Sequence, residues 1–294
     1  MTRKIMSRRF FAVIFAAIIA AGSLIGCGSA GTATAAPGSD GNVSKTLASL
    51  REKGKIVVGS SNDAPFAYID VATDKFSGID AEIMKEIAKR LGIDEVEMKV
   101  VEWDSLILEL NNNSIDIIAD AMYITDTRKE QVYFTDIWYS EADAVVIPAD
   151  SPLNSFEDLK DCTVAAQTGS EFLTTVQGWA DEGLIKDVAM YAEPDELLLA
   201  VNTGKVDACL VDDIIASYII ENNKSLTLKL LPGYESADEG MIGAAVTKSD
   251  PDFLKELNDT LNGMKEDGSL MKILESYGLT ANFVGVDEGK TTNK

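Results

Sequence analysis

Apolar positions along this chain form two kinds of pattern, short runs typical of strands and longer stretches with helical spacing. The clearest helical stretch begins at Asp80 and ends at Gly92. Its apolar residues share one face of the predicted helix: Ile83, Met84, Ile87, Ala88 and Leu91. Strands are predicted at residues 56–59, 96–101, 115–118, 163–166, 188–192 and within 205–212. Further helices are predicted at 105–110, from the turn 167–171 onward, at 195–202, 253–264 and 269–277.

Strands that alternate with helices favour an α/β fold with a mainly parallel sheet and right-handed crossovers. In such sheets, ligands bind beyond the carboxyl ends of the strands. Three segments fall at that edge in the first half of the chain: the loop Asp63–Phe66, the turn at Trp103, and the stretch Ala119–Thr135. The pattern therefore predicts a binding site there without naming the ligand.

The stretch Ala119–Thr135 combines an acid, an aromatic residue, hydroxyl groups and Arg128 directly after a strand of buried type. The planar guanidinium of Arg128 suits a carboxylate held by two parallel hydrogen bonds. The ring of Tyr123 offers a face for a cation. The alternative is an exposed loop with one solvated arginine, since charged residues are mostly exposed.

The same stretch resembles the solute-binding proteins of ABC importers, family 3, the polar amino-acid class. The family phrase A-G-M-T-I-T-x-x-R-x-x-x-V-x-F-S corresponds to Ala119–Thr135, and Asp136-Ile137-Trp138-Tyr139 follows where the family has D-P-Y-Y. Two later segments also match in family order, Phe156–Lys160 and Lys205–Asp212. The resemblance covers nearly the whole mature chain.

This resemblance implies a two-lobe periplasmic-binding-protein fold, each lobe a mainly parallel sheet flanked by helices, with a two-segment hinge. Lobe 1 is expected at 45–145 plus 241–286, lobe 2 at 146–240 and a C-terminal tail at 287–294. The chain should cross near Val145–Pro148 and return within Gly240–Val246. The implied role is capture of a small solute between the lobes by a monomer and its delivery to an ABC permease.

The resemblance also assigns site residues. Arg128 maps onto the residue that holds the ligand carboxylate, and Asp212 onto the residue that holds the α-amino group. The turn with Gly169 and Ser170 meets the ligand in the family. Three acidic or aromatic departures stand where the family has small or hydroxyl residues: Asp120, Tyr123 and Glu171. The expected ligand-binding residues are Asp63, Phe66, Trp103, Asp120, Ala121, Tyr123, Arg128, Gly169, Ser170, Glu171 and Asp212.

Within the family, the first lobe is similar to the ectoine-binding branch. There Phe66, Trp103 and Tyr123 would surround a delocalised cation, assisted by Asp63. Each of these residues also has a structural alternative. The aromatic residues can pack in the core, Asp212 can cap the next helix, and Glu171 can complement the first turn of its own helix.

The first 26 residues have the plan of a secretory signal, with Arg3, Lys4, Arg8 and Arg9 before an uncharged apolar run. Their ending, with Cys27 in Leu-Ile-Gly-Cys, resembles the bacterial lipobox and implies a lipid-anchored protein outside the cytoplasm. The alternative is an ordinary signal with an incidental cysteine. Residues 27–44 comprise the lipidated cysteine and a spacer rich in small residues.

Removal of the signal leaves 22 Lys and Arg against 48 Asp and Glu, a net charge of −26. This acidic balance argues against nucleic acid as a partner and is consistent with a cationic ligand. The chain has no histidine and no Cys/His cluster with zinc spacing, so we expect no metal and no cofactor. Cys162 and Cys209 can pair or remain two buried thiols, the interpretation that we favour.

Two function classes compete on this fold. A binding protein is favoured, because a lipid anchor and a spacer suit delivery to a permease better than turnover, and up to four acids against one arginine favour a ligand with net positive or delocalised charge. A dehydratase-like enzyme, with Glu171 or Asp120 as its acid, needs a raised carboxyl pKa that the sequence does not reveal. For a binding protein, the ligand stays open between a basic or polar amino acid and an ectoine-like solute.

Overall fold

The computed structural model of the protein describes residues 44–237 and 239–293. The expected signal peptide at 1–26, the expected lipidation site Cys27 and the expected spacer up to residue 43 lie outside them. Residues Asn42–Lys294 form one compact unit. In the described part of this unit, none of the helices combines the length and the apolar character that crossing a membrane requires.

The first of two five-stranded sheets forms the centre of lobe 1. Its strands are β1 (Lys55–Ser60), β4 (Glu95–Val100), β5 (Ile117–Ile118), β6 (Tyr133–Phe134) and β14 (Ala245–Val246). Their order is β4-β1-β5-β14-β6. β1 runs parallel to β4 and β5, whereas β14 runs antiparallel to β5 and β6. The helices of this lobe are α1 (Lys45–Lys53), α2 (Ile79–Leu91), α3 (Leu106–Asn111), α8 (Pro251–Glu266) and α9 (Ser269–Ser276).

Helix α2 shows how the hydrophobic pattern builds this lobe. On its apolar face, Ile83, Met84 and Ile87 are at most 1% exposed and pack into the core. Asp80 lies in the first turn, where a negative charge complements the helix dipole. Gly92 ends the helix in the left-handed region with φ +70°, which favours glycine. The predicted helix is therefore confirmed at both ends to within one residue.

The second sheet forms the centre of lobe 2. Its strands are β8 (Asp143–Pro148), β9 (Thr163–Gln167), β10 (Asp187–Tyr191), β11 (Ala208–Asp212) and β12 (Leu228–Leu230), in the order β10-β9-β11-β8-β12. β9 is parallel to β10 and β11, and β8 is antiparallel to β11 and β12. The helices of this lobe are η2 (Phe156–Asp161), α5 (Glu171–Asp181), α6 (Pro194–Asn202) and α7 (Asp213–Asn222).

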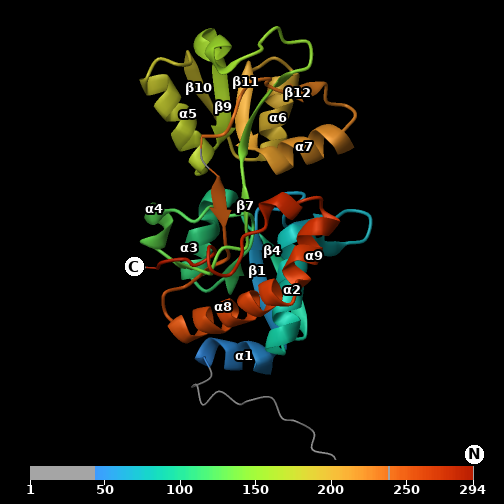
Figure 1. Ribbon diagram of the computed structural model, residues 1–294, viewed down its shortest axis with the longest axis vertical. Coiled ribbons are helices and arrows are strands. Elements are labelled where there is room, and N and C mark those ends of the chain that lie inside the picture. Colours follow the sequence, from blue (N-terminus) through green and yellow to red (C-terminus); the bar gives the residue numbers. More distant parts are fainter. Residues whose placement is uncertain (1–43, 238, 294) are drawn as a thin grey trace, which may run out of the picture. The chain divides into compact units, whose positions relative to one another are not determined.

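Two antiparallel strands, β7 (Tyr139–Glu141) and β13 (Gly240–Ile242), connect the lobes (Figure 1). The sequence placed the first crossing near Val145–Pro148, but this apolar run is already part of β8. The crossing comes earlier, in a Tyr-Ser-Glu segment whose polar residues give no strand pattern. The structure is thus an α/β fold with two lobes and two crossing segments, as predicted.

Smaller elements complete the described chain: the hairpin β2 (Tyr68–Asp70) and β3 (Lys75–Ser77), η1 (Trp103–Ser105), α4 (Asp126–Lys129) and η3 (Thr280–Asn282). Residues 287–293, expected as a tail, pack along β6. The side chain of Asn293 exchanges two hydrogen bonds of 2.8 Å with the backbone of Phe134, and Lys290 donates to Asp136 at 2.8 Å. Cys162 and Cys209 are both buried and free.

Candidate functional site

Arg128 lies between the two lobes. It stands on α4, a single helical turn where the sequence indicated a loop, and Thr125 caps that turn by accepting from the Arg128 N–H at 3.3 Å. Its Nη1 donates to the Tyr123 carbonyl at 2.8 Å and its Nη2 to the Gly169 carbonyl of lobe 2 at 3.3 Å. The guanidinium carbon lies 5.5 Å from the centre of the Trp103 ring, and Arg128 is 7% exposed. The alternative of a solvated arginine is therefore wrong.

Asp120 is buried in a network of hydroxyl groups at the end of β5. Its Oδ2 accepts from the Ser61 N–H at 2.7 Å and from Ser61 Oγ at 2.6 Å. Ser60 Oγ lies 2.6 Å from both Asp120 Oδ1 and the Ala67 carbonyl. Ser60 Oγ has only one proton to donate. It can form both hydrogen bonds only if it donates to the Ala67 carbonyl while a proton on Asp120 is donated to it. Burial raises the pKa of Asp120 to about 7, in agreement with that geometry.

Asp63 belongs to the same network, because its Oδ2 lies 2.9 Å from Ser61 Oγ. Burial and the neighbouring Asp120 raise the pKa of Asp63. Ala121, the next residue along the chain from Asp120, has φ +48° and donates its N–H to Asp80 Oδ2 at 2.7 Å. Asp80 also accepts from the Tyr139 hydroxyl at 2.8 Å, so one buried carboxyl ties α2 to the site loop and to crossing strand β7.

Asp212 faces this network from lobe 2. It ends β11 and occupies the N-cap position of α7, but its side chain makes no capping hydrogen bond. The N-cap alternative therefore does not explain its carboxyl group. Asp212 is 8% exposed, and burial raises its pKa to about 6.

The turn before α5 provides the other contacts from lobe 2. Ser170 caps α5 by accepting from the Leu173 N–H at 3.2 Å, and it donates to the Gln167 carbonyl at 2.7 Å. Gly169 has φ +78° and meets Arg128 through its carbonyl group rather than its N–H. Glu171 opens the helix, and its charge favours the ionised form of Arg128, whose pKa burial lowers.

These groups enclose a cavity of about 20 Å³, which we call the inner cavity. That volume holds about one water molecule, so the lobes are closed around their own side chains. Ten of the eleven expected residues line it, and the eleventh, Gly169, contacts Arg128. The lining is Asp63, Phe66, Trp103, Asp120, Ala121, Tyr123, Arg128, Gln167, Ser170, Glu171, Phe172, Asp212 and Ile215.

The three expected aromatic residues reach the inner cavity in different ways. Phe66 is 1% exposed and stacks on Tyr139 with ring centres 6.4 Å apart, so it belongs to the core as well as to the wall. Trp103 lies against the guanidinium of Arg128. Tyr123 meets Phe172 edge to face at 5.4 Å, and its buried hydroxyl has no hydrogen-bond partner among the described residues.

Comparison with known proteins agrees with this geometry. The family model described as "Bacterial extracellular solute-binding proteins, family 3" matches residues 56–280. The chain belongs to this family. It is 30% identical over 279 residues to the ABC transporter glutamine-binding protein GlnH of Bacillus subtilis (strain 168), covering 92% of this chain and 97% of the relative.

A second curated relative is the arginine-binding extracellular protein ArtP of the same organism, 28% identical over 230 residues, with 76% of this chain and 86% of ArtP covered. Among solved structures, a variant of the arginine-binding protein ArgBP from T. maritima superposes with a TM-score of 0.70 at 29% identity. The match covers 79% of this chain and 99% of that chain. The two-lobe fold class that the sequence predicted is thereby confirmed.

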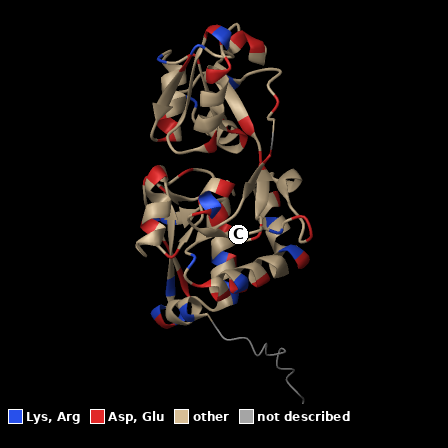
Figure 2. Ribbon diagram, turned by 90° about the vertical axis from the view of Figure 1, so that its left-hand side faces the viewer, with Lys and Arg blue, Asp and Glu red and all other residues tan. Residues whose placement is uncertain are grey.

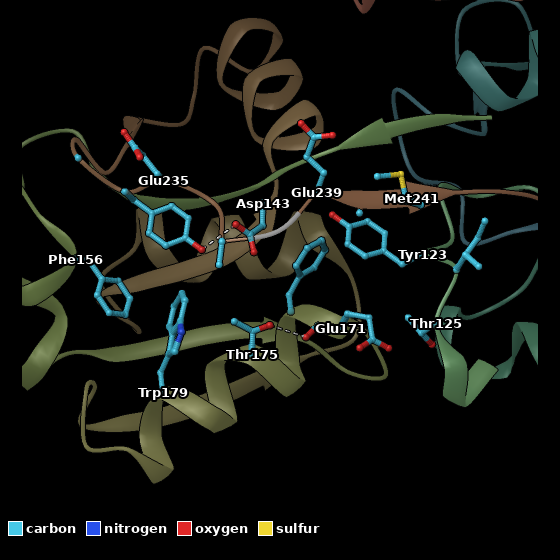
Figure 3. Close-up of a pocket in the computed structure, with 16 residues that line it drawn as sticks. Tyr123, Thr125, Asp143, Phe156, Glu171, Thr175, Trp179, Glu235, Glu239 and Met241 are labelled. Atoms are coloured by element: carbon cyan, nitrogen blue, oxygen red, sulfur yellow. Dashed lines mark hydrogen bonds between the residues drawn. The ribbon is translucent and has the colours of Figure 1, made fainter. Parts of the chain in front are cut away.

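This solute-binding protein has a second, larger hollow, which we call the outer cavity. Its volume is about 630 Å³, and it shares Tyr123, Glu171 and Phe172 with the inner cavity (Figure 3). Away from Tyr123 it is lined by a cluster of Phe156, Trp179 and Tyr234, whose ring centres are 4.8–6.0 Å apart. Tyr123 therefore forms part of the wall between the two cavities.

Three lining residues of this solute-binding protein were missed by the sequence analysis: Gln167, Phe172 and Ile215. Gln167 is the last residue of β9, so the strand-end argument that selected Asp212 also applies to it. Phe172 lies in the first turn of α5, next to Glu171. Ile215 lies inside α7, and no local signal distinguishes it from the core residues beside it.

Proposed function

We propose that this protein captures a positively charged or zwitterionic amino acid, or a similar solute, between its lobes and delivers it to an ABC permease. The observation that carries the proposal is the inner cavity, where one buried guanidinium meets four acidic residues from both lobes: Asp63, Asp120, Glu171 and Asp212. Figure 2 shows acidic residues at the ends of both lobes that face each other. An excess of negative charge in a desolvated site favours a cationic ligand.

The ligand carboxylate would accept hydrogen bonds from the guanidinium of Arg128. Without ligand, these N–H groups donate to the Tyr123 and Gly169 carbonyls. The ligand amino group would lie against Asp212, which has no capping bond to satisfy it. Truncating either partner of such a buried charge contact typically costs about 2–5 kcal/mol. Because the inner cavity is only about 20 Å³, the lobes must open for the ligand to enter. The two crossing strands are the natural hinge for this motion.

The printed names of the relatives support an amino acid as the ligand, since one binds arginine and another glutamine. The same names support partnership with an ABC transporter. A lipid anchor at Cys27, followed by a spacer, would hold the binding unit near such a permease as a monomer. If this is so, the Cys27→Ser variant will lose its acyl mass and leave the membrane fraction.

An ectoine-type solute is the second candidate. It is favoured by the four aromatic residues that line the inner cavity, because aromatic faces bind delocalised cations: Phe66, Trp103, Tyr123 and Phe172. An enzyme of the dehydratase type finds less support. Asp120, one of its candidate acids, is surrounded by the hydroxyl groups of Ser60 and Ser61. A proton on Asp120 would therefore be hydrogen-bonded within the protein rather than available to a substrate.

A thermal-shift screen against the common amino acids, ectoines and betaines would test the proposal. A ligand at a hundred times its Kd stabilises the folded state by about 2.7 kcal/mol. We expect a positive shift with basic or polar amino acids. The Arg128→Ala variant should lose this shift, with an affinity at least about 30-fold weaker.

The matched control is Lys129→Ala. Lys129 belongs to the same helical turn and pairs with the exposed Asp126 at 2.7 Å, away from the inner cavity. This variant should keep the wild-type shift. Tight binding of a neutral sugar without binding of any amino-acid-like compound would refute the proposal, and so would an Arg128→Ala protein that binds normally.

A further inference from the structure

Glu141, on crossing strand β7, is a buried carboxyl group that the proposed function does not use. It is 1% exposed, and neither of its carboxyl oxygens has a hydrogen-bond donor among the described residues. It pairs in the hinge with Gly240 of β13. Asp120, by contrast, has a backbone N–H and two hydroxyl groups around it. A buried carboxylate without any donor is costly, so Glu141 requires an explanation.

The carboxyl group of Asp212, which lines the inner cavity, lies beside Glu141. Asp212 pairs with Asp143, two residues after Glu141, and the Asp213 N–H donates to the Ala142 carbonyl at 3.0 Å. Other acidic residues surround this pair. Asp213 of α7 and Asp80 of α2 add negative charge near Glu141, and Asp143 of β8 adds it near Asp212. One carboxyl oxygen of Asp213 is also without a hydrogen-bond partner in the described chain. The nearby Tyr123 hydroxyl is unpartnered as well. Asp212 in turn favours the ionised form of Arg128.

Two buried carboxyl groups in contact cannot both be ionised at low cost, and they share a proton instead. Burial, followed by the charge of Asp212, raises the pKa of Glu141. A proton shared by the pair would supply the hydrogen bond that the other described residues do not offer. With that proton the pair has one negative charge rather than two.

We propose that Glu141 and Asp212 hold one proton between them in the unliganded protein, and that the ligand's ammonium group takes the place of that proton. This inference rests on the proposed function and adds Glu141 to its site. The charge balances: the pair changes from one negative charge to two, the ligand keeps its own positive charge, and the displaced proton passes to the buffer.

The exchange has a consequence for specificity. An ammonium or guanidinium group brings N–H donors that satisfy both carboxylates, whereas a quaternary ammonium group brings charge without donors. The pair therefore selects primary amines and guanidines over betaines. Because a proton competes with the ligand, affinity should rise with pH while the pair is singly charged, by up to tenfold per pH unit for one displaced proton.

The test is calorimetry at pH 7 with arginine as the probe, in buffers of different ionisation enthalpy, which yields the number of protons released on binding. Wild-type protein should release at least one proton. Glu141→Gln, which mimics the protonated acid in shape, should release about one proton fewer and bind with an affinity that depends less on pH. The matched control Glu235→Gln, at an exposed residue of the outer cavity, should behave like wild type.

The outcomes separate this inference from the proposed function. If wild type binds arginine without releasing a proton, or if Glu141→Gln releases as many protons as wild type, the shared proton is refuted, while loss of binding in Arg128→Ala still supports the site. The wild-type measurement stands even if the Glu141→Gln protein does not fold. Failure of wild type to bind arginine, lysine, glutamine or any other amino acid would overturn both proposals.

Discussion

The two cavities share a wall but differ in volume and in most of the residues that line them. The inner cavity measures about 20 Å³ and is lined by buried charges from both lobes, whereas the outer cavity measures about 630 Å³ and is lined by aromatic rings and surface acids. By volume alone the outer cavity would be preferred to the inner one. In a protein with two lobes, however, closure of the lobes reduces the volume of a site between them. Buried charged residues from both lobes therefore indicate such a site better than its volume does.

Tyr123 is the boundary between these two regions. Its ring lies directly against Gly240 of crossing strand β13, so closely that a Cβ at Gly240 would overlap the ring. Its hydroxyl is buried and has no partner in the described chain (Figure 3). A hinge strand and a site residue are thus in contact, and a motion of the hinge would move the wall of the inner cavity.

The strongest test of the comparison exchanges one tryptophan in each cavity. Trp103→Ala removes the ring against Arg128, and we expect affinity for the ligand to fall about 10- to 30-fold. Trp179→Ala should leave affinity within about twofold. Because Trp179 packs against Phe156 and Tyr234, its loss should lower the free energy of unfolding by about 2 kcal/mol. Calorimetry and urea unfolding would measure both effects, and the reverse pattern would identify the outer cavity as the site.

The buried carboxyl groups in and near the inner cavity also predict how stability depends on pH. Burial raises the pKa of Asp80 and of Asp212 to about 6 and that of Asp120 to about 7, above their values in the unfolded chain. The unfolded state therefore binds fewer protons between about pH 4 and 7, so stability falls as pH rises. We expect the unliganded protein to lose about 5 kcal/mol of its free energy of unfolding between pH 5 and pH 8.

Urea unfolding at both pH values would measure this loss. The window is suitable because the carboxyls with lowered pKa, such as Asp250 at about 2, are ionised throughout it. Asp212→Asn removes one of the titrating groups and should flatten the dependence. A protein that becomes more stable toward pH 8 without ligand would show that these carboxyls are not held as the structure indicates.

A smaller effect is expected from Gly240→Ala, which tests the wall itself. The added methyl group would push the Tyr123 ring away from β13, an overpacking that typically costs about 1–3 kcal/mol. We expect ligand affinity to fall about tenfold as the wall shifts. Gly178→Ala is the control, because no atom lies within 4 Å of the new methyl group and the site is inside helix α5. It should be neutral or stabilising by up to about 1 kcal/mol.

Much of this molecule could be predicted because local chemistry and global fold agree. The apolar face of α2, its stop at Gly92 and the alternation of strands and helices all appear in the sequence with the correct period. Asp212 was selected because it ends a predicted strand, and Arg128 because its stretch follows another predicted strand at the edge where ligands bind. The family resemblance then gave each of them a role to test.

Glu141 shows why the rest could not be predicted. An acid in a three-residue strand has no periodic pattern, and an exposed surface position is its usual environment. Its burial depends on the pairing of β7 with β13, two segments about 100 residues apart. Ile215 is similar, since the face that α7 presents to the cavity depends on how the lobes close. Sequence patterns define the elements but not the contacts between distant ones.

The smallest expected difference compares one hydroxyl group from each cavity. Ser61 Oγ lies within hydrogen-bond distance of both Asp120 and Asp63, so Ser61→Ala removes the hydroxyl group that bridges these carboxyls and should cost about 1–2 kcal/mol of stability. Thr175 Oγ1 lines the outer cavity and donates at 3.2 Å to the Glu171 carbonyl of its own helix. Thr175→Val keeps the shape and should change stability by less than about 0.5 kcal/mol, because that bond is weak and local. Urea unfolding of both variants at pH 8 would decide the matter. Equal losses of stability in the two variants would contradict this comparison. They would mean that the hydroxyl network around Asp120 stabilises the inner cavity no more than the helix bond of Thr175 stabilises the outer cavity.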